Sequence, residues 1–108
     1  MNLRRRLPLA LAVVLLTACF GNHPLPEWKS SQSPEPNSRR VDHLEKILNT
    51  QAWQRSPYSR VEDALEMPVY LIVADDRTAC IATAEDWTIA SHGDFYPCPG
   101  KWRIPRGG

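Results

Sequence analysis

The residues of this sequence with the most reactive side chains are its three cysteines, Cys19, Cys80 and Cys98. A cysteine thiolate can be acylated, oxidised to a disulfide or bound to a metal ion. Metal and redox sites favour closely spaced ligands such as Cys-x-x-Cys, and no such pair occurs here. The three histidines add no metal-binding pattern, because they are scattered at His23, His43 and His92. We therefore expect no metal and no cofactor.

The chain begins like an exported protein. Arg4, Arg5 and Arg6 precede an apolar run from Leu9 to Leu16, which is the basic and then hydrophobic order of a signal peptide. A transmembrane helix needs about 20 apolar residues, so this run is too short to span a bilayer. An uncleaved signal anchor is the less favoured alternative.

The residues that follow the apolar run, Leu16-Thr17-Ala18-Cys19, resemble the lipobox of bacterial lipoproteins. The resemblance covers only about the first 19 residues. It implies cleavage of the signal peptide (1–18), a thioether-linked diacylglycerol on Cys19 and commonly a third acyl chain. Several acyl chains anchor a protein stably, whereas a single chain binds membranes only marginally. Phe20 is not the aspartate that tends to retain lipoproteins at the inner membrane of enteric bacteria, so the resemblance favours the periplasmic side of the outer membrane.

Export also bears on the remaining cysteines and on the charge. Cys80 and Cys98 form an even pair in a chain that leaves the reducing cytosol, so we expect a disulfide between them. Loss of the three signal arginines from 13 basic residues leaves ten against 12 acidic residues. A slightly acidic exported chain lacks the basic face of a nucleic-acid-binding protein. We therefore predict no nucleic-acid partner.

The pair of His92 and Asp94, two residues apart, is the one feature that suggests acid/base catalysis. A carboxylate can orient an imidazole and raise its basicity. The surrounding Ser91-His92-Gly93-Asp94 has the composition of a turn, however, and no recognisable nucleophile accompanies it. A solvated turn is the favoured interpretation, both here and at the Asp75-Asp76 pair, and we assign no catalytic residue.

The C-terminal segment after Cys98 is basic and contains no acidic residue. Trp and Arg are the residue types that dominate binding hot spots. The candidate partner-binding residues are therefore Lys101, Trp102, Arg103 and Arg106, which would meet an anionic envelope partner such as lipid headgroups, an acidic glycan or a protein. The favoured alternative is that Trp102 packs beside the disulfide while the charges remain solvated.

Composition divides the mature chain into a tether and a folded part. Residues 19–38 are rich in Pro, Ser and Asn, which predicts a lipidated, disordered tether that lifts the domain from the headgroups. Trp28 is the exception, since it can enter the membrane interface, dock on the domain or bind a partner. We expect residues 39–108 to form one small domain.

The apolar pattern of residues 39–68 predicts helices. Val41, Leu44, Ile47 and Leu48 recur at helical spacing behind the capping residue Asn37 or Ser38. Ser59-Arg60-Val61-Glu62 matches a capping box, which predicts a short second helix through Ala64 and Leu65 that ends at Pro68. Residues 53–58 would link the two helices.

The pattern changes to strands beyond Pro68. Residues 69–74 and 78–83 read as a hairpin around a turn at 75–77, followed by a strand near 87–90, a turn at 91–94 and an extended piece at 95–98. The predicted fold class is α+β, with one or two N-terminal helices packed on a three- to four-stranded antiparallel sheet and stapled by the disulfide. A small β-barrel with peripheral helices is the alternative.

Two functions follow from these features. The favoured function is a non-enzymatic, lipid-anchored envelope module that binds a partner. The alternative is a small envelope enzyme, or an enzyme accessory, that uses His92 and a nearby carboxylate.

Overall fold

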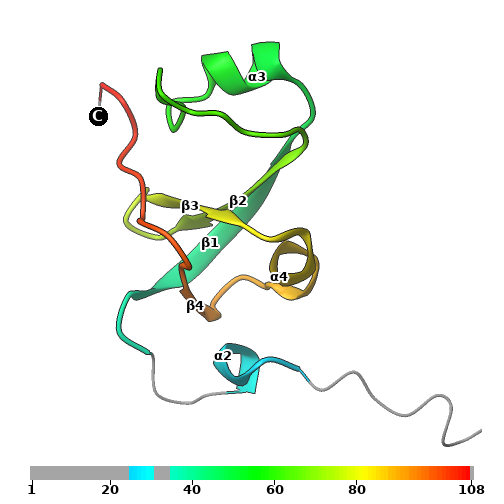
Figure 1. Ribbon diagram of the computed structural model, residues 1–108. Coiled ribbons are helices and arrows are strands. Elements are labelled where there is room, and N and C mark those ends of the chain that lie inside the picture. The colour runs from blue at the N-terminus through cyan, green and yellow to red at the C-terminus, as the bar shows by residue number, and fades with distance from the viewer. Residues whose placement is uncertain (1–24, 31–34, 108) are drawn as a thin grey trace, which may run out of the picture.

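The computed structural model describes residues 25–30 and 35–107, so the predicted signal peptide, Cys19 and residues 20–24 lie outside the described residues. The described elements are, in chain order, α2 (Glu27–Ser30), β1 (Ser38–Ile47), α3 (Thr50–Arg55), β2 (Val69–Ala74), β3 (Ala79–Ala82), α4 (Ala84–Ile89) and β4 (Phe95–Pro97). The strands form one four-stranded antiparallel sheet in the order β3-β2-β1-β4, shown in Figure 1. Among the described residues, no helix is long and apolar enough to cross a membrane.

The segment predicted to be the first helix is the strand β1, and that prediction was wrong. β1 pairs through Ser38, Arg39 and Arg40 with β4, and through Val41 and residues 43–47 with β2. Its register shifts between Val41 and His43, which marks a β-bulge. The extra residue places Val41 and Leu44 on one face, opposite Ala74 and Ile72, although they are three residues apart. This spacing of three, together with Ile47 in the core on the opposite face, imitated helical periodicity.

The second predicted helix was also wrong, because residues 60–68 form turns and irregular chain. The Ser59 hydroxyl does not cap a helix but donates to the Ser56 carbonyl at 2.9 Å. The helix α3 lies earlier, in the segment predicted to be a linker. It begins after Asn49, whose side-chain oxygen accepts a hydrogen bond from the Ala52 amide. Asn is among the best N-cap residues, and α3 buries Trp53 against the sheet.

The predicted hairpin is confirmed as β2 and β3, joined by a turn in which Arg77 has a φ of 71°. The predicted strand near 87–90 was wrong, since these residues belong largely to the helix α4. The hydroxyl of Thr83 caps α4 by accepting from the Asp86 amide, and acidic residues in the first turn suit the positive end of the helix dipole. The extended piece after the 91–94 turn is confirmed as β4.

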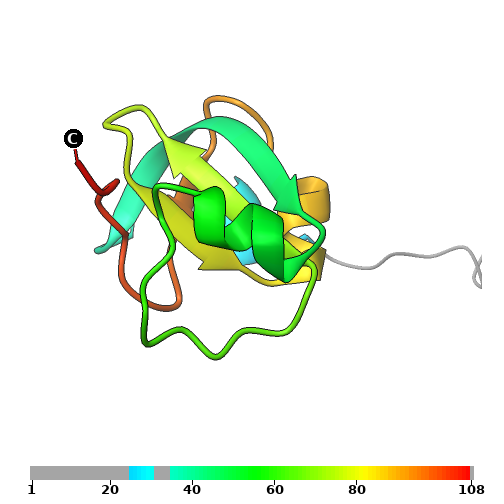
Figure 2. The same cartoon turned by 90° about the horizontal axis from the view of Figure 1, so that it is seen from above.

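The sheet is curled and has an apolar core on each face. One core contains the disulfide and the buried residues beneath α2 and α4, with Val41, Ile72 and Tyr96 at its centre. The other core lies under α3 and contains Trp53, Tyr58 and Leu71 among others. Figure 2 looks down on α3, with the strands curving beneath it. Burial on both faces explains why nearly all of β2 is apolar and buried.

The predicted disulfide is confirmed, with Cys80 and Cys98 joined and their Cα atoms 5.8 Å apart. Cys80 lies on β3, at one edge of the sheet, and Cys98 follows β4, at the other edge. The disulfide therefore joins the two edges of a curled sheet. The prediction of an α+β fold with a disulfide-stapled antiparallel sheet is confirmed at this level, while the two predicted helix positions are corrected as above.

The disulfide should contribute strongly to the stability of the fold. It closes a loop with a sequence separation of 18 residues, for which loop entropy predicts about 3 kcal/mol. Replacing both Cys80 and Cys98 with Ala should lower the free energy of unfolding by about that amount, measured by urea denaturation of the mature protein. A loss well under about 1 kcal/mol would show that packing alone closes the sheet.

Candidate functional site

The four candidate residues at the C-terminus do not form one surface. Lys101 is exposed, whereas Trp102 is only 9% exposed and belongs to the core that contains the disulfide. The Trp102 indole N–H donates to the Asn37 carbonyl at 2.7 Å, and its ring packs edge-on against Tyr96. Trp102 thus packs in the core that holds the disulfide.

Arg103 is tied into the fold by both its backbone and its side chain. Its amide and carbonyl each bond to Ala79, which adds a bridge to the edge of β3. Its guanidinium binds both carboxylate oxygens of Asp63, at 2.8 and 2.9 Å, and also donates to the Tyr58 carbonyl. It lies 5.8 Å from the centre of the Trp53 ring, in cation–π geometry. Arg103 therefore fastens the C-terminal segment to the loop after α3.

The hydrogen bond from Arg103 holds the pKa of Asp63 below its usual range, against a smaller opposing effect of burial. The Arg60 amide also donates to this carboxylate. The Asp63 side chain is 7% exposed and that of Arg103 is 23% exposed. A bidentate pair at this depth is well shielded from solvent, so its charges are satisfied within the fold.

A cleft of about 300 Å³ lies beside α3, lined in part by Thr50, Trp53, Arg60, Val61 and Arg106. We call it the α3 cleft. Arg60 donates to the carbonyls of Pro57, Ser59 and Ile104, and Arg106 donates to those of Gln54 and Ser56. A guanidinium carries five N–H donors, so these bonds fix both side chains and still leave donors for a ligand. Because Asp63 in this cleft is neutralised by Arg103, the cleft keeps an excess of positive charge.

His92 and Asp94, whose spacing suggested an acid/base pair, each bond to other groups. His92 contacts the Asp42 carbonyl at 2.8 Å, and the Asp94 carboxylate accepts bonds from Lys29 and from the Ser91 amide instead. The imidazole that does meet carboxylates is His43, which lies between Asp42 and Glu45 at 2.7 and 2.8 Å. Hydrogen bonds to these two carboxylates raise the pKa of His43. Its side chain is 49% exposed, so the cluster is a solvated surface network.

Sequence reasoning missed both Arg60 and the His43 cluster. Arg60 stood inside an apparent capping box, where only the flanking Ser59 and Glu62 carried the signal. The bulge in β1 brings the His43 side chain beside that of Asp42, and no local sequence pattern indicates that bulge.

Asp75 and Asp76 lie in the predicted turn and form ion pairs with Arg40 and Arg39, respectively. Within the described ranges, no group of His, Cys, Asp and Glu side chains is arranged to hold a metal ion.

Comparison of the chain with protein families, with curated proteins and with solved structures finds no match.

The Asp63–Arg103 pair predicts a pH-dependent stability. A carboxyl group whose pKa is lowered in the folded protein stabilises it above the unfolded pKa of about 3.9, and this contribution disappears as the pH falls through the folded pKa. Asp63→Asn should cost about 2 kcal/mol near neutral pH. The stability difference between the two proteins should shrink on acidification, measured by thermal melts across the acid range. A difference that is independent of pH would contradict this assignment.

Proposed function

We propose that this chain is a lipid-anchored lipoprotein of the bacterial cell envelope that acts as a non-enzymatic binding module. The anchor rests on the basic start, the short apolar run and Leu16-Thr17-Ala18-Cys19. A protein in that compartment meets oxidising conditions, and the Cys80–Cys98 disulfide is consistent with such a location. The periplasmic side of the outer membrane is the proposed place.

The α3 cleft is the proposed binding site, and the observation that carries it is the pair of fixed arginines. Arg60 and Arg106 are held by backbone carbonyl acceptors, so a ligand need not order them again. Prior ordering of this kind lowers the entropic cost of binding. Val61, which is fully exposed, supplies apolar contact in the same cleft. The ligand chemistry that fits is an anionic component of the envelope.

Two of the four C-terminal candidates differ from the other two in how firmly the fold holds them. Arg106 remains a binding residue and Arg60 joins it, while Lys101 is an exposed cation on the same C-terminal segment. Trp102 and Arg103 have structural contacts that a ligand would have to break. Replacing Arg103 would therefore weaken the fold together with any binding, so it is a poor probe of function.

Binding by the α3 cleft is tested with residues 20–108 as a soluble protein and vesicles of phosphatidylglycerol as the anionic probe. A basic residue near an anionic surface contributes about 1 kcal/mol, so Arg60→Gln with Arg106→Gln should weaken affinity roughly thirtyfold. The matched control is Lys46→Gln with Arg77→Gln, which removes equal charge from exposed positions outside the cleft. Equal losses in both double variants would mean that net charge, and not the cleft, binds the vesicles.

The anchor is tested by feeding cells labelled palmitate and recovering the protein. The label should enter the chain and disappear in the variant Cys19→Ser, because only the lipobox cysteine is acylated by this route. The variants Cys80→Ser and Cys98→Ser provide the control and should keep the label. An unlabelled protein, or a label that survives Cys19→Ser, would refute the lipoprotein assignment.

A further inference from the structure

The short helix α2 lies within the segment predicted to be a free tether, yet it packs on the domain. Trp28 is 9% exposed, and its ring meets Tyr96 edge-on with the ring centres 5.0 Å apart. The Lys29 ammonium bonds to the Asp94 carboxylate at 2.6 Å and to the Ser91 hydroxyl at 3.1 Å. The Trp28 indole thus buries apolar surface against the domain. The side chains of the Lys29–Asp94 ion pair are each only about one-fifth exposed to solvent. α2 is therefore part of the folded unit.

Docking of α2 shortens the connection between the domain and Cys19. Only residues 20–24 separate Cys19 from Leu25, the first described residue. An extended chain advances at most about 3.5 Å per residue, so Leu25 lies no more than about 21 Å from Cys19. A tether that ran freely to residue 38 would reach roughly three times as far. An acylated Cys19 would thus hold the α2 end of the domain close to the bilayer.

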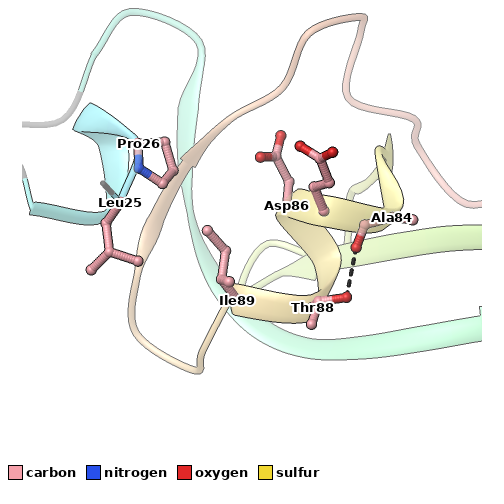
Figure 3. A pocket seen from close by; sticks show the side chains of 7 residues that line it. Leu25, Pro26, Ala84, Asp86, Thr88 and Ile89 are labelled. Atoms are coloured by element: carbon pink, nitrogen blue, oxygen red, sulfur yellow. Dashed lines mark hydrogen bonds between the residues drawn. The ribbon is translucent and has the colours of Figure 1, made fainter. Parts of the chain in front are cut away.

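The surface at this end is an apolar groove between the start of α2 and the helix α4. Figure 3 shows Leu25 and Pro26 on one side and Ala84, Thr88 and Ile89 of α4 on the other. Leu25 is 58% exposed, so the groove presents apolar side chains to its surroundings. The Thr88 hydroxyl donates to the Ala84 carbonyl at 2.7 Å, which satisfies its donor inside the helix. We call this surface the α2–α4 groove.

Charge at the rim of the groove indicates which lipids it suits. Glu85 and Asp86 line it together with the apolar residues. The Asp86 carboxylate accepts a hydrogen bond from the Tyr96 hydroxyl at 2.6 Å and so is engaged with the core, whereas Glu85 is exposed. Acidic groups are repelled by anionic headgroups. The contact therefore favours a bilayer of zwitterionic lipids.

We propose that the α2–α4 groove is the membrane-facing surface of the domain, resting on the zwitterionic headgroup region of the bilayer that holds Cys19. This inference depends on the proposed acylation. It gives the domain a fixed orientation, because α3 lies at the end opposite α2 in Figure 1. The α3 cleft then points away from the anchoring membrane, toward partners in the envelope space.

The orientation is tested with the acylated, isotope-labelled protein in nanodiscs of phosphatidylethanolamine that contain a trace of lipid with a gadolinium-chelating headgroup. Paramagnetic relaxation falls steeply with distance from the metal. The backbone amide signals of residues 84–89 should lose several-fold more intensity than those of residues 60–63. Equal losses at the two ends, or larger losses at residues 60–63, would overturn the proposal.

Two matched variants separate membrane contact from effects on folding. Leu25→Asp places a charge in the groove and should reduce the relaxation of residues 84–89. Leu48→Asp changes a leucine beside α3 that is comparably exposed, at 66%, and should leave the pattern unchanged. A second experiment places the paramagnetic label on one copy of the chain and observes residues 84–89 of another copy. Relaxation of these residues by that label would assign the groove to a dimer and contradict the proposal.

The outcomes also separate the orientation from the anchor. A mass without added lipid on Cys19 would refute the proposed function and this inference together. An acylated protein whose two ends relax equally would refute the orientation alone and leave the anchor intact.

Discussion

Closure of the sheet by the Cys80–Cys98 disulfide is the constraint on which the rest of the structure depends. Neighbouring strands lie about 4.8 Å apart, so the edges of a flat four-stranded sheet would be about 14 Å apart. The two joined Cα atoms, on β3 and just after β4, are 5.8 Å apart. The sheet must therefore curl, and its concave side must hold residues that fill the space. Tyr96 is fully buried there, together with Val41 and Ile72.

Tyr96 links the surrounding elements to this closed sheet. Its ring meets Trp28 of α2 and Trp102 of the C-terminal segment edge-on, and its hydroxyl donates to Asp86 of α4. Burial and the neighbouring Asp86 carboxylate raise the pKa of Tyr96. The other face depends on Arg103 in a comparable way, since this residue joins the C-terminal segment to Asp63, Tyr58 and β3. Aromatic packing and ion pairs thus fix both α2 and the C-terminal segment to the domain.

Sequence reasoning recovered what local composition determines. The hairpin of β2 and β3 followed from a β-branched run with an acidic turn, and the disulfide followed from the count of cysteines in an exported chain. It failed where tertiary contacts decide. The bulge in β1 gave a strand helical spacing, and the strand-like Trp87 and Ile89 became helical because Thr83 caps α4 and Trp87 reaches the Glu45 carbonyl. At the candidate site, Arg106 was foreseen, but the converging Arg60 depends on a loop conformation that no short motif encodes.

The proposed function joins these parts into one arrangement. A lipid on Cys19, a short connection and the docked α2 would place one end of the domain at the membrane and the α3 cleft at the other. The lipid anchor and the disulfide are tested together by the intact mass of the protein extracted from membranes, recorded with and without reduction. The protein should begin at Cys19, carry at least a diacylglycerol, and gain two hydrogen atoms on reduction. A chain without lipid, or one whose mass does not change on reduction, would contradict this expectation.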